Sequence, residues 1–198
     1  MTMINNCLKT NFGIEVDYNI EISLEAFPAI IDKLGGVRIE LTQAEADYIN
    51  GLGYEWIDEV YEGENRLFGH AALQYARMRK AEGDSDSDIK RSARQRLVIE
   101  KLFEKIRGLS VTELQSVADT LLPEITTTMT PGDVVSIMTR ILPVLKDVKI
   151  VGATIPYDKT GWGEIIDIYE DGIPDSVIKF EAPQQKKLIR AITEAEGA

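Results

Sequence analysis

Residues 18–41 read YNIEISLEAFPAIIDKLGGVRIEL, and this stretch carries the pattern that predicts the fold. The segments YNIEI and VRIEL have the short, alternating character of strands. Between them, Ser23 is a suitable cap for a helix that runs through LEAFPAIIDKL and stops at Gly35 and Gly36. A helix that crosses over between two strands predicts that the strands are parallel. The sequence therefore predicts an α/β fold in which helices cover a mixed sheet in α-β-α layers.

The flanking segments extend this prediction in both directions. The first residues predict a short helix that ends at Asn11 or Gly13, and the polar segment 50–68 predicts a loop. Capping signals are present at Thr42 with Glu45, Ser110 with Glu113, and Thr130 before Pro131. Further helices are predicted at 42–49, 69–80, 89–107, 110–122, 131–146 and from residue 183, and strands at 148–156 and 165–169. We expect one domain over residues 1–198.

Composition limits the classes of function. The chain has 198 residues, 44% of them apolar, and a net charge of −11, which disfavours binding to nucleic acid. Its one cysteine, Cys7, excludes an internal disulfide and a zinc site made of thiolates. The sequence has no apolar run of about 18 residues and no signal-peptide pattern, so we expect this chain to be soluble without a membrane span of its own.

A second stretch, residues 75–96, reads YARMRKAEGDSDSDIKRSARQR and concentrates arginine at the start of a predicted helix. At 100° per residue, Arg91, Arg94 and Gln95 share one stripe with the apolar residues of the later turns. The arginines of this stripe are therefore expected to point toward the core. Cations there need an anion, because they lose hydration and oppose the positive end of the helix dipole.

Two sources of that anion remain open. Acidic neighbours can neutralise the helix start as caps and ion-pair partners, namely Asp84, Asp86 and Asp88. A bound phosphate or pyrophosphate is the alternative, because guanidinium groups match its oxygens in pairs and a helix start adds free backbone N–H groups. Arg77 and Arg79 end the preceding predicted helix and are expected to reach the same place.

Other local patterns are interpreted as structural. The acidic residues at 84–88 resemble a calcium loop but have Ile89 where glycine is required and Gln95 where glutamate is required. The single histidine, His70, cannot form a histidine-based metal site and is expected at the surface. Packing is the predicted role of Trp56 and Trp162, and of the apolar stripe formed by Val134, Ile137, Met138 and Ile141.

Three motifs in order resemble the LytR-CpsA-Psr family of cell-envelope proteins. They are LEAFPAIIDKLGGVRIEL, LFGHAALQYARMRK and DIKRSARQRLV, and the resemblance is strongest over residues 10–110. It implies an enzyme that transfers a phosphate-linked glycopolymer, such as teichoic acid or capsular polysaccharide, from a polyprenyl pyrophosphate carrier to peptidoglycan. It also implies magnesium as a cofactor, and a site at the extracytoplasmic face of a bacterial membrane.

The resemblance assigns roles to individual residues. The pyrophosphate would be bound by the arginine pair and by the last motif, that is by Arg77, Arg79, Arg91, Arg94 and Gln95. Arg91 and Asp88 would be the catalytic residues, with Asp88 orienting Arg91, because the surrounding cations keep its carboxylate ionised. The sequence departs from the family pattern at Phe68, His70, Ile89 and Lys90.

Further expectations concern the segment before the chain and the alternatives to catalysis. The family's magnesium ligands and membrane anchor are expected upstream of Met1. The 198-residue chain is therefore expected to retain binding of the lipid-linked donor better than transfer of its glycan. Strands without those neighbours favour association between copies of the chain. Two other functions stay open: a non-catalytic module that binds polyprenyl pyrophosphate, and a transcriptional regulator, which the acidic charge disfavours.

Overall fold

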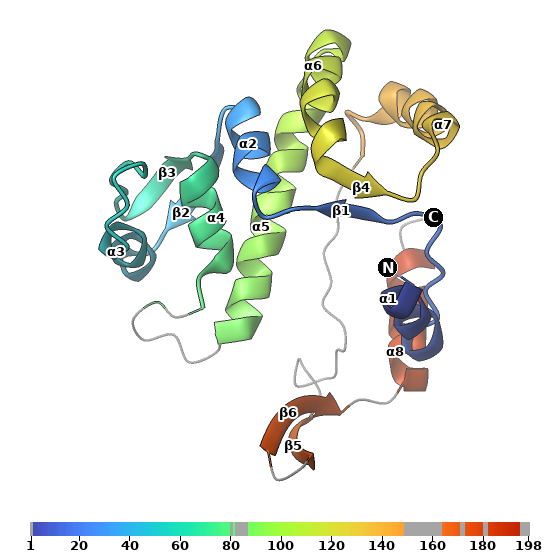
Figure 1. Cartoon of the computed structure of the whole chain (residues 1–198). Coiled ribbons are helices and arrows are strands. Elements are labelled where there is room, and N and C mark those ends of the chain that lie inside the picture. The colour runs from blue at the N-terminus through green and yellow to red at the C-terminus, as the bar shows by residue number, and fades with distance from the viewer. Residues whose placement is uncertain are drawn as a thin grey trace. The chain divides into compact units, whose positions relative to one another are not determined.

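The computed structural model describes residues 2–79, 81, 87–148, 164–170, 173–179 and 182–194. The chain divides into two compact units, one of residues 1–19 with 151–198 and the other of residues 20–150. Both helices and short strands are present in the chain (Figure 1). The predicted mixed α/β class is therefore confirmed.

The larger unit contains most of the predicted elements. Its helices and strands, in chain order, are β1 (Ile20–Ile22), α2 (Ala26–Lys33), β2 (Val37–Leu41), α3 (Gln43–Gly51), β3 (Gly63–Leu67), α4 (Gly69–Arg77), α5 (Ser87–Arg107), α6 (Val111–Leu121), β4 (Ile125–Thr127) and α7 (Pro131–Ile141), with short 3-10 turns at Leu122–Glu124 and Leu142–Val144.

The strands of the larger unit pair differently from the prediction. β2 pairs with β3 in antiparallel register, with Val37 opposite Leu67, and β1 pairs antiparallel with β4. The two strands around α2 thus belong to different sheets, and the predicted parallel pair is wrong. β3 lies within the segment 50–68, which was predicted to be a loop. That prediction is wrong for β3, whose sequence GENRL is polar and has one buried residue, Leu67.

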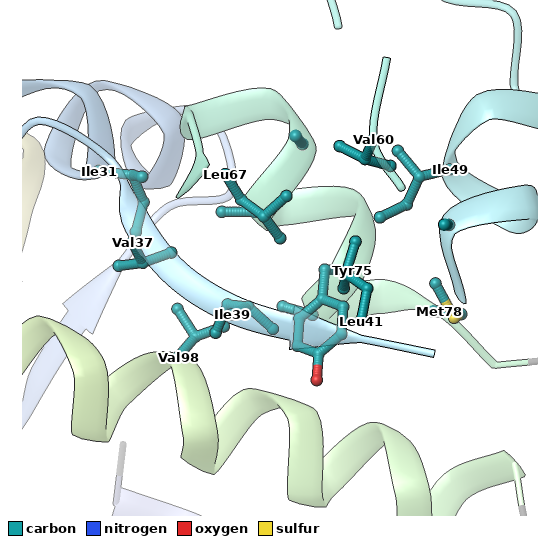
Figure 2. Close-up of a cluster of buried hydrophobic side chains, with 14 of the residues drawn as sticks. Ile31, Val37, Ile39, Leu41, Ile49, Val60, Leu67, Tyr75, Met78 and Val98 are labelled. Atoms are coloured by element: carbon teal, nitrogen blue, oxygen red, sulfur yellow. The ribbon is translucent and has the colours of Figure 1, made fainter. Parts of the chain in front are cut away.

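The core of this unit is built around β2. Val37, Ile39 and Leu41 are buried, whereas the alternating Arg38 and Glu40 are exposed. Figure 2 shows β2 passing between two helices, with Val98 of α5 close to Ile39. The cluster also contains Ile31, Ile49, Val60, Leu67, Tyr75 and Met78. Each large apolar side chain stabilises the fold by about 1.5–3 kcal/mol when buried, so this cluster fixes α4 and α5 relative to β2.

Local signals predicted the helix ends well. Ser23 Oγ accepts a hydrogen bond from the Ala26 amide at 3.1 Å, and α2 is followed by Gly35 and Gly36 with φ of 74° and 77°. Capping boxes are present at Thr42 with Glu45 and at Thr130 with Asp133, and Ser110 exchanges the same pair of bonds with Glu113. The helix predicted over 131–146 ends earlier, at Ile141, because Pro143 lies in the turn that follows and has no N–H to continue it.

The apolar stripe of α7 is not part of the core. Met138 is 38% exposed and Ile141 41% exposed, while Val134 and Ile137 are half-buried. The prediction that these residues pack in the core is therefore wrong for the described part of the chain.

The smaller unit combines both ends of the chain. The helix α1 (Thr2–Cys7) continues as a π-helix over Leu8–Phe12 that ends at Gly13, as predicted, and this segment packs against α8 (Ala182–Glu194). β5 (Glu164–Glu170) and β6 (Ile173–Lys179) form an antiparallel hairpin, which confirms the strand predicted at 165–169. The strand predicted at 148–156 falls almost wholly outside the described residues.

Candidate anion-binding site at the start of α5

The candidate site lies where the end of α4 meets the first turns of α5. Two side chains of α5 donate hydrogen bonds to the backbone at the end of α4, both at 3.3 Å: Gln95 Nε2 to the Ala76 carbonyl in its last turn, and Arg94 Nη1 to the carbonyl of Met78, which follows the helix. These bonds hold the segment that carries Arg77 and Arg79 against α5. The two arginine-rich motifs of the sequence, separated by a segment outside the described residues, are thereby brought together in space.

Arg94 is committed to an ion pair inside the protein. It is 7% exposed, and its Nε donates to Glu45 Oε1 at 2.7 Å. The other oxygen of Glu45 accepts from the Thr42 amide at 3.1 Å, so one carboxylate caps α3 and neutralises Arg94. The helical stripe correctly placed Arg94 toward the core. Its anion, however, comes from α3, a source that was not considered for this arginine.

Tyr75 completes the surroundings of this ion pair. Its ring centroid lies 6.0 Å from the Arg94 guanidinium carbon, and the ring is 3% exposed. Burial, followed by the nearby Glu45 carboxylate, raises the pKa of the Tyr75 hydroxyl to about 12. Tyr75 is therefore neutral at physiological pH and does not add charge to the site.

The other predicted ligands lie closer to solvent. Met78, the residue after α4, is fully buried, and Arg77 and Arg79 on either side of it are exposed. Arg91 is half-buried one turn before Gln95, which is exposed. Arg77 and Arg79 thus leave the backbone on the solvent side, whereas Arg94 is buried. The side chain of Asp88 and the residues Asp84 and Asp86 lie outside what the structure describes, so their predicted pairing with these arginines stays a prediction.

A small hollow opens beside the ion pair. It has a volume of about 230 Å³ and is lined by Glu45, Tyr75, Lys90, Ala93, Arg94 and Leu97. Its walls combine apolar surface with a lysine at the rim. Arg77, Arg79 and Gln95 are not part of this lining, so the hollow does not enclose these predicted ligands.

Two features of the described residues concern metal binding and membranes. In that part of the chain, no group of three or more His, Cys, Asp or Glu side chains is placed to hold a metal ion. Among the same residues, no helix has the length and apolar character needed to span a bilayer.

Comparison with known proteins shows the family to which this chain belongs. The LytR_cpsA_psr family matches residues 1–188, and the chain belongs to this family. It is similar to the polyisoprenyl-teichoic acid–peptidoglycan teichoic acid transferase TagU of Bacillus licheniformis, with 38% identity over 97 residues. That match covers 49% of this chain and 28% of the relative.

Solved structures share the fold. TagT of B. subtilis superposes with a TM-score of 0.67 at 19% identity, covering 98% of this chain and 66% of that one. A structure described as TagT bound to LIIa-WTA gives a TM-score of 0.68 at 21% identity, with coverage of 96% and 65%. The fold of this chain is therefore that of the TagT domain, and the chain spans about two thirds of it.

The sequence did not indicate the residues that contact Arg94 in the structure. Glu45 was identified only as part of a capping box, and Tyr75 was not singled out. Nothing local could reveal that Glu45 meets a residue 49 positions later.

Proposed function

We propose that Arg77, Arg79 and Arg91 at the α4–α5 junction bind the pyrophosphate of a polyprenyl-linked glycan. The observation that carries the proposal is the pair of bonds from Arg94 and Gln95 to the Met78 and Ala76 carbonyls, which holds two arginine motifs side by side. Guanidinium groups bind phosphate oxygens in pairs and stay charged at all physiological pH values. Membership of the LytR-CpsA-Psr family supports the choice of ligand.

The predicted ligands have two different roles in this proposal. Arg77, Arg79 and Arg91 are the residues proposed to contact the pyrophosphate. Arg94 and Gln95, first expected to be ligands, become positioning residues in this proposal, because they bond the Met78 and Ala76 carbonyls at the end of α4 and Arg94 is also neutralised by Glu45. Asp88 keeps its proposed part of orienting Arg91.

The proposed reaction is transfer of a glycan phosphate to peptidoglycan. The oxygen of an acceptor hydroxyl forms a bond to the glycan-side phosphorus, the bond to the bridging oxygen breaks, and polyprenyl phosphate leaves with the electron pair while the hydroxyl proton is released. Positively charged groups held around the pyrophosphate stabilise the charge that moves to the leaving phosphate. Arg91 is proposed to act on that charge during the transfer itself.

The lipid and the cofactor are further parts of the proposal. The hollow beside Tyr75 and Leu97 adjoins the arginines and offers apolar surface for the first units of the prenyl chain. Magnesium, which the family implies, would add a further cation at the phosphates when bound. Its ligands are not identified among the described residues, so the proposed roles of the arginines do not depend on it.

The proposed setting follows from the family. Its substrates would be a glycan linked to polyprenyl pyrophosphate and the peptidoglycan acceptor, met at the outer face of a bacterial membrane. Teichoic acid or capsular polysaccharide would be the transferred polymer.

Calorimetry with geranyl pyrophosphate, a short polyprenyl pyrophosphate, tests the proposal. Arg91→Lys keeps the charge but removes the planar pair of donors, and we expect it to weaken binding by about 1.5–3 kcal/mol. Arg140→Lys, at an exposed position in the last turn of α7, is the matched control and should bind like the wild type. Equal affinity of the Arg91→Lys protein and the wild type would refute a site built on guanidinium pairing.

A further inference from the structure

A second hollow in the larger unit lies at the other end of α4. It has a volume of about 220 Å³ and is bounded by the loop that contains Trp56, the end of β3 and the first turn of α4 at His70. Arg77 is in the last turn of α4, seven positions after His70, which corresponds to a rise of about 10 Å at 1.5 Å per residue. The two sites are therefore separate, although they share one helix.

Aromatic rings form part of its wall, and they are held in place. Trp56 is 67% exposed, so its indole does not pack in the core as the sequence suggested. Tyr54 stacks on it with ring centroids 5.0 Å apart and planes 12° apart, and His70 meets it edge-on at 6.5 Å. Phe68, 45% exposed, lies below the guanidinium of Arg66 at 5.4 Å. An exposed indole fixed by two neighbours is a rigid apolar surface open to a ligand.

Polar groups surround these rings. Asp32, Asp58 and Glu59 line the hollow and are exposed, and one oxygen of Asp32 accepts a hydrogen bond from the Gly69 amide at 2.7 Å. Tyr61 holds Glu59 in place through a hydroxyl bond of 2.8 Å. A carboxylate has two acceptor oxygens, so it can receive hydrogen bonds from two neighbouring hydroxyl groups.

The combination of a fixed indole and carboxylate acceptors fits a sugar. A pyranose ring has a face of C–H groups with partial positive charge, which matches the negative face of an aromatic ring, and a rim of hydroxyl donors. The volume is below the roughly 300 Å³ at which pockets for drug-sized ligands begin, and so suits a single ring.

The charge of this hollow differs from that of the candidate pyrophosphate site and favours a different ligand. The lining contains the carboxylates of Asp32, Asp58 and Glu59 against one guanidinium, that of Arg66, and is therefore acidic. An acidic hollow repels phosphate and favours a neutral ring, such as a hexose or an N-acetylated hexosamine.

We infer that the hollow at Trp56 is a subsite for a neutral pyranose ring of a glycan. The ring's source rests on the proposed function: it belongs either to the glycan acceptor or to the polymer being transferred. The binding of a sugar by this hollow does not depend on transfer.

The test follows the Trp56 indole N–H by NMR during titration of the whole chain with two probes. An N-acetylglucosamine tetramer represents the acceptor backbone, and a glucosylated glycerol phosphate oligomer represents the donor polymer. A shift of the Trp56 signal with the first probe alone assigns the hollow to the acceptor, and with the second alone to the donor. A shift with both supports a subsite that accepts either ring, and a shift with neither overturns the inference.

Variants test whether the Trp56 indole and the Asp58 carboxylate contribute to sugar binding. We expect Trp56→Ala to weaken sugar binding about tenfold and Trp56→Phe to weaken it less, because an aromatic face contributes on that scale. Asp58→Asn, followed by the same Trp56 signal, should also weaken binding. Trp56→Ala binding as tightly as the wild type would overturn the inference.

Arg91→Lys separates this inference from the proposed function. The substitution should leave sugar binding unchanged while it weakens binding of geranyl pyrophosphate. Loss of sugar binding in Arg91→Lys would overturn the claim of two separate sites. A wild-type chain that binds the sugar but no pyrophosphate would refute the proposed function alone.

Discussion

Arg94 and Glu45 form a buried ion pair, with 2.7 Å between Nε and Oε1 and side chains that are 8% and 11% exposed. The pair joins α5 to α3, and Arg94 also bonds the Met78 carbonyl, so it supports the backbone next to Arg77 and Arg79. This arrangement makes the geometry of the candidate site depend on a carboxylate that is not among the proposed pyrophosphate ligands. It also separates two kinds of arginine at the site, those that support it and those that are open to solvent.

Removal of Glu45 should destabilise the fold strongly. Glu45→Ala leaves a buried guanidinium without its partner, which costs about 3–5 kcal/mol, and it also removes the capping box of α3. Urea denaturation measures the loss. The matched control is Glu104→Ala, which removes the solvent-exposed pair with Lys101 and should cost at most about 1 kcal/mol. Similar losses for the two variants would show that the buried pair is not structural.

Tyr75 should make stability depend on alkaline pH. The folded state raises the pKa of this hydroxyl from 10.0 to about 12, so its contribution to stability is complete below pH 10 and is lost as the pH rises toward 12. The free energy of unfolding should fall with a slope of at most about 1.4 kcal/mol per pH unit in this window. Tyr75→Phe keeps the ring and removes the hydroxyl, so its stability should show a smaller fall over the same window. An unchanged pH profile in Tyr75→Phe would contradict the assignment.

Gly36 should not tolerate a side chain. Its φ is +77°, and a Cβ there would lie 2.9 Å from the Leu67 carbonyl oxygen, at the start of the β2–β3 pairing. The conformation alone costs an alanine about 1–2 kcal/mol, and the contact adds to this cost. Gly53→Ala provides the control, because Gly53 has φ of +64° and open space around it. Thermal denaturation should show a larger loss for Gly36→Ala, and equal losses would mean that the close approach to Leu67 has no energetic effect.

Helix boundaries were predictable because their causes are local. The bond from the Ala26 amide to Ser23, the pair formed by Thr42 and Glu45, and the left-handed Gly35 all involve residues within a few positions of one another. Strand pairing is set by contacts between distant segments. The strand GENRL is mostly polar, so it has no apolar alternation that would indicate a strand. The partner of β2 was missed for this reason.

The candidate site shows the same division. The 100° periodicity correctly indicated that Arg94 points inward, whereas Gln95, which was placed on the same stripe, is exposed. It could not reveal which anion Arg94 meets, because Glu45 approaches from a different helix. Nor could composition show that Trp56 stays exposed, since aromatic residues are more often buried and only the stacking on Tyr54 explains its position.

The central claim is that Arg77, Arg79 and Arg91 at the α4–α5 junction bind a pyrophosphate, and the NMR signals of the arginine Nε–H groups test it most directly. On titration with geranyl pyrophosphate, we expect the signals of Arg77, Arg79 and Arg91 to shift together and saturate, with no change at Arg140. Geraniol, which has the same chain without phosphate, should leave all four signals in place. Shifts that are equally small at every arginine, Arg140 included, would contradict the account.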